Sequence, residues 1–265
     1  MPWATVHWRS EVLAKQTTMQ VILPSVGRPP YAAFYLLHGL GDDSTIWLRR
    51  TRVEMYARAL PLIVVMPDGY RGFYTDQAEG PAYGRHFGLE IPEFVERTFP
   101  ARPARGARAI GGLSMGGYGA LRVALRYPER FCSANSHSGA VMRFNLELGP
   151  KAARTDPVFR RHPPAFFAEM RRIFGRRPLG TRHDLLALAR RARRRHRQLP
   201  AILLDCGTED TLLEYNRGLH RDLAAARVPH VYREFPGGHD WDYWDAHVRE
   251  ALEFHAARLH LPAAR

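Results

Sequence analysis

The amino-acid sequence predicts an α/β protein, built on a mostly parallel sheet with helices on both faces. Short apolar runs alternate with helix-forming stretches along the 265 residues, which is typical of parallel strands joined by helical crossovers. A glycine-rich turn between one apolar run and the next helix carries a serine, as expected where chemistry is placed at a strand end. The length suits a single domain over 1–265, because α/β folds of about 250 residues commonly form one unit.

The apolar runs place the strands of this sheet. Buried parallel strands read as near-continuous apolar segments, because helices cover both of their faces. The segments that fit this description are 34–37, 62–66, 109–111, 133–136, 202–205 and 231–235.

The most informative motif is GLSMG at 112–116, a G-x-S-x-G between a predicted strand and a predicted helix. A serine on such a sharp turn exposes its hydroxyl, because small neighbours relieve the crowding around it. The following helix directs its amide groups and positive dipole end toward the same place. Glycines here could instead serve ordinary packing of a helix on a sheet. The strand before the motif and the helix after it favour a nucleophile at Ser114.

Candidates for an acid and a base follow in the chain order serine, acid, histidine that such sites use. The fifth apolar run ends near Asp205, Glu209 and Asp210, and the sixth is followed by Pro-Gly-Gly and His239. Asp205 lies within the strand, so its side chain should point into the sheet. Glu209 and Asp210 are adjacent, so only one should face the histidine, and we favour Asp210. Open α/β sheets place site residues at these carboxyl ends.

Six segments also match one family pattern in order: YLLHGLGD at 35–42, MPDG at 66–69, FYTD at 73–76, GGLSMGGYGAL at 111–121, DCGTED at 205–210 and FPGGHDW at 235–241. On these segments the chain resembles the esterase D family of α/β-hydrolases, which includes tributyrin-type carboxylesterases, S-formylglutathione hydrolases, feruloyl esterases and mycolyltransferases. The resemblance covers about residues 5–255. The stretch 11–24 resembles the paired N-terminal strands of the small bacterial tributyrin-esterase branch.

This resemblance implies the α/β-hydrolase fold and a set of site residues. It implies Ser114 as the nucleophile, Asp210 as the acid and His239 as the base. The backbone amides of Leu40 and Met115 would form the oxyanion hole. In this fold a cap is usually inserted over the site, and residues 144–199 are the expected cap-like insertion.

Aromatic residues near the site are candidates for the substrate pocket. Phe159, Phe166, Phe167, Met170 and Phe174 could roof an acyl pocket, but side chains at helical spacing usually mark a buried face. We expect most of these to pack the cap onto the body. Closer to the catalytic loops, one or two of five further residues should line the pocket: Trp47, Phe73, Tyr74, Trp241 and Trp244.

The net charge of +13 raises the question of an anionic partner. Much of it lies in two arginine clusters, at 171–177 and 190–197. The arginines of the second cluster should surround most of a helix, and no aromatic residues lie among them to stack on bases. We therefore expect a solvated helical face and no dedicated nucleic-acid partner.

Other classes of site are not indicated. Cys132 and Cys206 are far apart and should be reduced thiols, and no clustered ligands predict a metal or another cofactor. No apolar run has the length of a membrane span, and the start of the chain lacks the apolar core of a signal peptide. These features predict a cytoplasmic protein and leave its oligomeric state open.

Two classes of function remain at this point. The first is a serine carboxylesterase that hydrolyses short-chain acyl esters through an acyl-enzyme, with an S-formylglutathione hydrolase-type thioesterase as the alternative. The second is a non-catalytic binding protein with the α/β-hydrolase fold. The intact set of Ser114, Asp210 and His239 favours an enzyme acting on a small-molecule ester or thioester.

Overall fold

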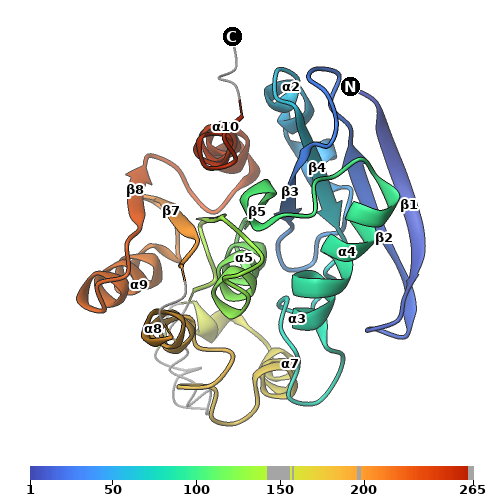
Figure 1. The fold of residues 1–265 in the computed structure, drawn as a ribbon. Coiled ribbons are helices and arrows are strands. Elements are labelled where there is room, and N and C mark those ends of the chain that lie inside the picture. Colours follow the sequence, from blue (N-terminus) through green and yellow to red (C-terminus); the bar gives the residue numbers. More distant parts are fainter. Residues whose placement is uncertain (142–155, 157, 196–197, 262–265) are drawn as a thin grey trace.

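The computed structural model describes residues 1–141, 156, 158–195 and 198–261. Within them the strands form one eight-stranded sheet in the order β1-β2-β4-β3-β5-β6-β7-β8 (Figure 1). The two pairings that involve β2 are antiparallel, and the other pairings are parallel. The strands are β1 (Trp3–Ser10), β2 (Lys15–Ile22), β3 (Ala32–Leu37), β4 (Leu62–Pro67), β5 (Arg108–Gly112), β6 (Ser133–His137), β7 (Ala201–Gly207) and β8 (Val231–Phe235).

The predicted fold class is confirmed, and each predicted strand is present with bounds shifted by one or two residues. The N-terminal pair begins earlier than expected, because β1 starts at Trp3 and not near residue 11. Alternate residues of this strand are exposed, as on an edge strand with one open face. That pattern lacks the continuous apolar run by which the central strands were found.

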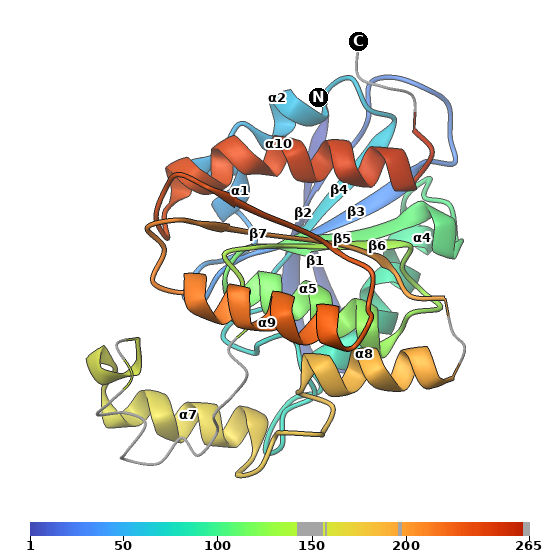
Figure 2. The same cartoon turned by 90° about the vertical axis from the view of Figure 1, so that its left-hand side faces the viewer.

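Helices cover both faces of the sheet (Figure 2). One face carries α1 (Ile46–Arg50), α2 (Val53–Ala57) and α10 (Trp241–Arg258). The opposite face carries α3 (Tyr83–Arg85), a π-helical turn (His86–Glu90), α4 (Ile91–Thr98), α5 (Met115–Arg126), α8 (Leu185–Arg194) and α9 (Leu213–Ala225). Short 3₁₀ turns lie at Arg105–Ala107 and Phe159–Arg161.

The apolar run of strand β3 contributes side chains to the hydrophobic core on each face of the sheet. Phe34 and Leu36 pack into the core under α10, whereas Tyr35 and Leu37 pack into the core under α5. Successive side chains of a strand point to opposite faces of the sheet, so a central strand must be apolar at every position.

The described part of the expected insertion has two structurally different portions. Helix α7 (Pro164–Phe174) lies apart from the sheet, beyond the layer formed by α5, α8 and α9, as Figure 2 shows. It is bound to a neighbouring loop by hydrogen bonds from the Ala78 amide to the Ile173 carbonyl (2.8 Å) and from the Glu79 amide to the Arg172 carbonyl (2.9 Å). Helix α8 instead packs against α5 and α9, within the helical layer of the body. Residues 142–155, 157, 196 and 197 of this stretch lie outside the described residues.

The arginines at the C-terminal end of α8 are spread around the helix. Leu185, Leu188 and Ala192 are buried, and the arginines at 190, 191 and 193–195 are exposed. Arginines also reach the sides that face the body, because Arg191 and Arg195 line a small surface pocket with Leu125 of α5, and Arg193 donates to the Ala226 carbonyl at the end of α9. This agrees with the expectation that arginines surround most of the helix. These arginines are exposed to solvent, as the sequence predicted.

Two further expectations concern the cysteines and the membrane. Cys132 and Cys206 are both free thiols. Across the described ranges, no helix combines the length and the apolar character needed to span a bilayer.

Candidate active site

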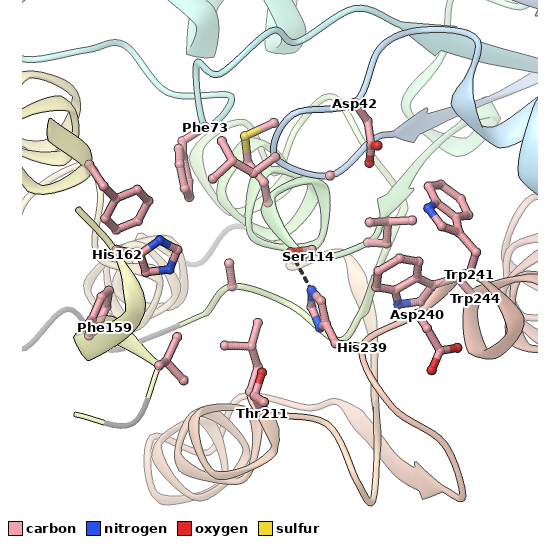
Figure 3. Close-up of a pocket in the computed structure, with 18 of the residues that line it drawn as sticks. Asp42, Phe73, Ser114, Phe159, His162, Thr211, His239, Asp240, Trp241 and Trp244 are labelled. Carbon is pink, nitrogen blue, oxygen red and sulfur yellow. Dashed lines mark hydrogen bonds between the residues drawn. The ribbon is translucent and has the colours of Figure 1, made fainter.

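Three polar side chains meet at the carboxyl ends of three parallel strands. Ser114 follows β5, Asp210 follows β7 and His239 follows β8. The Nε2 of His239 lies 3.0 Å from Ser114 Oγ, and its Nδ1 lies 2.9 Å from Asp210 Oδ2 (Figure 3 draws the first of these bonds). Residues 125 and 29 positions apart in the sequence are thus brought into one hydrogen-bonded chain.

Ser114 adopts a backbone conformation that non-glycine residues rarely take, with φ of 50° and ψ of −116°. Such strain persists only where the surroundings fix it. Here the Ser114 amide donates to the His137 carbonyl at 2.9 Å. Gly112 and Gly116 allow the turn to lie directly against β3, since a Cβ on either would come within 2.6 Å of the Leu37 carbonyl oxygen. The hydroxyl is therefore presented at a sharp strand-to-helix turn.

Asp210 is buried and held by several donors. Its Oδ1 accepts from the Leu212 amide at 2.7 Å, while its Oδ2 faces His239. Burial acts to raise the pKa of Asp210, but the hydrogen bond and charge of His239 and the Leu212 amide outweigh it. The net pKa is below the ordinary value. Asp210 is thus kept as a carboxylate beside the imidazole.

The competing acids have other partners. Glu209 is exposed, and its carboxylate accepts from the Gly237 amide and the Thr208 hydroxyl, which ties the loop after β7 to the loop after β8. Asp205 lies inside the sheet, where it accepts from His137 Nδ1 at 2.8 Å and from the Tyr243 hydroxyl at 3.0 Å. Of the three acids, only Asp210 contacts His239.

His239 is partly open to the cavity and is supported by its own loop. Its side chain is 29% exposed, and its ring meets the Trp244 ring edge to face at 5.0 Å. The next residue, Asp240, begins α10 and accepts from the Tyr243 amide at 3.0 Å, as an N-cap does. The histidine is therefore attached to the start of a long, packed helix.

Leu40 and Met115, which the resemblance implies as oxyanion donors, both line the cavity beside Ser114. The chain turns sharply just after Leu40, where Gly41 has a φ of +91° that favours glycine. Met115 is the first residue of α5, and the first amides of a helix have no intrahelical acceptor. The Leu40 amide therefore comes from a loop and the Met115 amide from a helix start, and both residues lie at the cavity that contains Ser114.

The cavity around Ser114 has a volume of about 560 Å³ and two unlike walls. In Figure 3, Phe73, Phe159 and His162 lie on one side of Ser114, and the other side carries acids and tryptophans. Its lining comprises Gly39, Leu40, Asp42, Arg50, Phe73, Leu113, Ser114, Met115, Ala140, Val158, Phe159, His162, Phe166, Thr211, Leu212, His239, Asp240, Trp241 and Trp244.

Of the five aromatic residues expected near the substrate, Phe73, Trp241 and Trp244 line this cavity. Trp47 and Tyr74 do not, so three of the five line the cavity where one or two were expected. Both are fully buried and donate to main-chain carbonyls, Trp47 Nε1 to Leu37 at 3.1 Å and Tyr74 Oη to His38 at 2.9 Å.

In the region 158–174, some apolar side chains line the cavity and others are buried away from it. Phe159 and Phe166 line the cavity, whereas Phe167, Met170 and Phe174 are buried away from it. Three of these five side chains therefore pack as expected, and the other two form part of the cavity wall.

Five polar lining residues were missed by the reasoning from sequence: Asp42, Arg50, His162, Thr211 and Asp240. Asp42 and Asp240 lie inside motifs that matched the family, so adjacency to those motifs could have indicated them. His162 had no signal, because its place depends on stacking against Phe166 with the ring centroids 4.0 Å apart.

Two polar groups on opposite sides of the cavity have shifted pKa values. Burial raises the pKa of Asp42, and burial together with the Arg71 charge lowers the pKa of His162. Both shifts favour the neutral forms of these two groups. Within the described part of the chain, no cluster of three or more metal-ligating side chains is found.

Comparisons with known proteins agree on the chemistry. The model of the family described as "Putative esterase" matches residues 10–255. An acetyl esterase from Caldicellulosiruptor saccharolyticus is 33% identical over 262 residues, covering 94% of this chain and 96% of its own.

Two solved structures from Staphylococcus aureus are similar across nearly the whole chain. A substrate-bound fluorophosphonate-binding serine hydrolase and an S-formylglutathione hydrolase each give a TM-score of 0.82 at 28% identity, covering 96% of this chain and 98% of theirs. On the family match and these relatives, the chain belongs to this esterase family, and the protein is a carboxylic ester hydrolase with the α/β-hydrolase fold.

Proposed function

We propose that the protein is a serine carboxylesterase that hydrolyses short-chain acyl esters, with Ser114 as nucleophile, His239 as base and Asp210 as orienting acid. The observation that carries the proposal is the hydrogen-bonded chain from Asp210 through His239 to Ser114, at 2.9 and 3.0 Å. These lengths lie within the reach required for proton transfer between a nucleophile and its base.

The proposed mechanism assigns one task to each group. His239 takes the proton of Ser114 as its oxygen attacks the ester carbonyl, then gives that proton to the departing alcohol. Asp210 fixes the imidazole tautomer and stabilises the imidazolium. The amides of Leu40 and Met115 hold the developing oxyanion, and one such donor contributes roughly 10²–10³ in rate. Water, activated by His239, then cleaves the acyl-enzyme.

The preference for short acyl groups rests on the shape and lining of the cavity. The wall formed by Phe73, Phe159 and Phe166 is apolar, and the volume is about 560 Å³. Each buried methylene contributes about 0.8 kcal/mol until the chain outgrows the wall. We expect kcat/KM on p-nitrophenyl esters to peak between about two and six acyl carbons. The acetyl ester named for the Caldicellulosiruptor relative lies at the short end of that range.

The experiment that tests the proposal begins with Ser114→Ala. We expect a fall in kcat of roughly 10⁴-fold or more, with the fold unchanged by circular dichroism. A fluorophosphonate probe should label Ser114 alone in the wild-type protein, and tryptic mass spectrometry identifies the site. Label on another serine, or full activity of the variant, would contradict the assignment.

A thioesterase acting on S-formylglutathione is the second candidate, supported by the likeness to the S-formylglutathione hydrolase from Staphylococcus aureus. The substrate of that activity is anionic, so its capture should depend on salt and on nearby arginines. We place it second because two acids, Asp42 and Asp240, line the cavity against one arginine, Arg50.

Kinetics on both substrate types separate these candidates. Neutralising Arg193, Arg194 and Arg195 together should leave kcat/KM for p-nitrophenyl acetate unchanged. A strong preference for S-formylglutathione that weakens with salt and with this triple variant would make the thioesterase the primary activity.

A further inference from the structure

Three consecutive main-chain carbonyls before Leu40 each accept a hydrogen bond from a buried side chain. The Leu37 carbonyl accepts from Trp47 Nε1 at 3.1 Å, and the His38 carbonyl accepts from the Tyr74 hydroxyl at 2.9 Å. The Gly39 carbonyl accepts from Nδ1 of His38 at 2.7 Å. The segment that leads to the proposed oxyanion donor is thus fixed residue by residue.

The first two of these donors come from opposite faces of the sheet. Trp47 belongs to the core under α10, and Tyr74 belongs to the core under α5. The two hydrogen bonds therefore hold the end of β3 from both sides of the sheet. Burial raises the pKa of Tyr74, which keeps its hydroxyl as a donor at every working pH.

The imidazole of His38 is fixed in one tautomer by its two neighbours. Its Nε2 accepts from the Gly69 amide at 2.8 Å, so this nitrogen carries no proton. Its Nδ1 must then carry the proton that it donates to the Gly39 carbonyl. His38 is buried, and it connects the loop at 39–41 to the loop at 68–70.

The same carbonyls also lie against the turn that carries Ser114. A Cβ on Gly116 would lie 2.5 Å from the Leu37 oxygen and 2.7 Å from the His38 oxygen, so the first turn of α5 contacts this segment without space between them. The position of the Leu37 and His38 carbonyls therefore sets the distance between the Leu40 amide and the Met115 amide.

We propose that Trp47, Tyr74 and His38 are positioning residues, which hold the Leu40 amide at the place where the oxyanion develops. The proposal rests on the proposed function, since it concerns the oxyanion of that reaction. A donor contributes to catalysis only if it is aimed at the oxyanion of the transition state, and an error of about 1 Å can cost 10²-fold in rate. Loss of one of these side-chain hydrogen bonds to the segment before Leu40 should therefore lower kcat and leave KM nearly unchanged.

The chain offers a matched control for Tyr74. Tyr118 is also buried, and its hydroxyl donates to a main-chain carbonyl, that of His183, at 2.8 Å. Tyr74→Phe and Tyr118→Phe each remove one buried hydroxyl from one carbonyl. They differ in whether that carbonyl belongs to the segment before Leu40.

The experiment compares both variants and Trp47→Phe with the wild type on p-nitrophenyl acetate and with an alkyl trifluoromethyl ketone. This ketone forms a tetrahedral serine adduct with an oxyanion. We expect Tyr74→Phe to lower kcat by about 10- to 100-fold and to weaken ketone binding by the same factor. KM should change less than threefold, and Tyr118→Phe should keep wild-type values of all three quantities.

Two results would overturn the proposal. One is a folded Tyr74→Phe protein with kcat and ketone binding within twofold of wild type. The other is an equal loss in Tyr118→Phe. If Tyr74→Phe does not fold, the same comparison is made with Trp47→Phe. An active Ser114→Ala variant would instead refute the proposed function, so the two failures are distinguishable.

Discussion

The protein holds two histidine–aspartate pairs of almost the same geometry in very different surroundings. His239 Nδ1 lies 2.9 Å from Asp210, and His137 Nδ1 lies 2.8 Å from Asp205. Both acids belong to the short segment at the end of β7. The side chain of His239 is 29% exposed, whereas that of His137 is 0% exposed.

The difference lies in what the second ring nitrogen of each histidine faces. In His239 it meets the Ser114 hydroxyl at the cavity. In His137 it is buried and has no hydrogen-bond partner among the residues that the structure describes. The His137–Asp205 pair (the inner pair) instead supports the site of the His239–Asp210 pair (the outer pair). The His137 carbonyl accepts from the Ser114 amide, and the Asp205 carbonyl accepts from the Ser138 amide. A histidine–aspartate contact alone therefore does not indicate catalysis.

The largest expected effect concerns the outer pair. Asp210→Asn should lower kcat by about 10⁴-fold, because an amide at this place no longer imposes the required imidazole tautomer. The matched control is Glu209→Gln, which changes the neighbouring acid and should cost less than tenfold. Steady-state kinetics on p-nitrophenyl acetate measure both. The reverse ranking would make Glu209 the orienting acid.

Substitution in the inner pair should lower the stability of the protein and have little effect on kcat. Asp205→Asn removes one member of a buried pair and leaves His137 without its carboxylate, which we expect to lower the free energy of unfolding by about 3–5 kcal/mol. Urea denaturation measures this loss. The folded variant should keep kcat within about tenfold of wild type. A 10⁴-fold fall in kcat at unchanged stability would show that both pairs serve the reaction.

The buried imidazole of His255 sharpens the comparison, because its hydrogen-bond partners among the described residues are uncharged. A neutral ring satisfies both neighbours, with Nε2 donating to Asn135 Oδ1 and Nδ1 accepting from the Ser133 hydroxyl, each at 2.8 Å. Burial lowers the pKa of His255 to about 3, with the charges of His137 and Arg258 adding to the effect.

This shift predicts how stability depends on pH. The folded-state pKa lies below the unfolded value of about 6.5, so the unfolded chain takes up the proton first as pH falls. The contribution is complete above pH 6.5 and declines between pH 6.5 and 3, by about 2 kcal/mol at pH 5. His255→Gln should flatten the decline in urea-unfolding free energy over this range, whereas the exposed His260→Gln should not. Parallel pH profiles of wild type and His255→Gln would contradict the prediction.

Much of the fold and of the candidate site could be predicted, because both depend on local sequence. Central strands must be apolar on both faces, so their runs are continuous and visible. The serine turn needs glycines at fixed offsets, which is why Ser114 could be found from one motif. The structure brings Ser114, Asp210 and His239 together, and their catalytic roles stay a prediction.

The remaining features depend on contacts that a pattern cannot show. Glu209 and Asp210 are alike in sequence, but Glu209 is held by the Gly237 amide, 28 residues away, and by the adjacent Thr208 hydroxyl. Trp47 and Tyr74 lie beside catalytic loops, so they resemble pocket walls. Their true place is decided by carbonyls 10 and 36 positions away. Apolar periodicity carries no information about such polar contacts.

Helix α7 has a consequence for how this enzyme could diversify. Its last turn is bound to the loop at 78–79, and Glu169 pairs with Arg71 at 2.6 Å, so helix and loop form one unit beside the cavity. None of these atoms belongs to the loops that carry Ser114, Asp210 or His239. Substitutions in this unit should therefore change the cavity wall at Phe166 and leave the loops that carry Ser114, Asp210 and His239 in place.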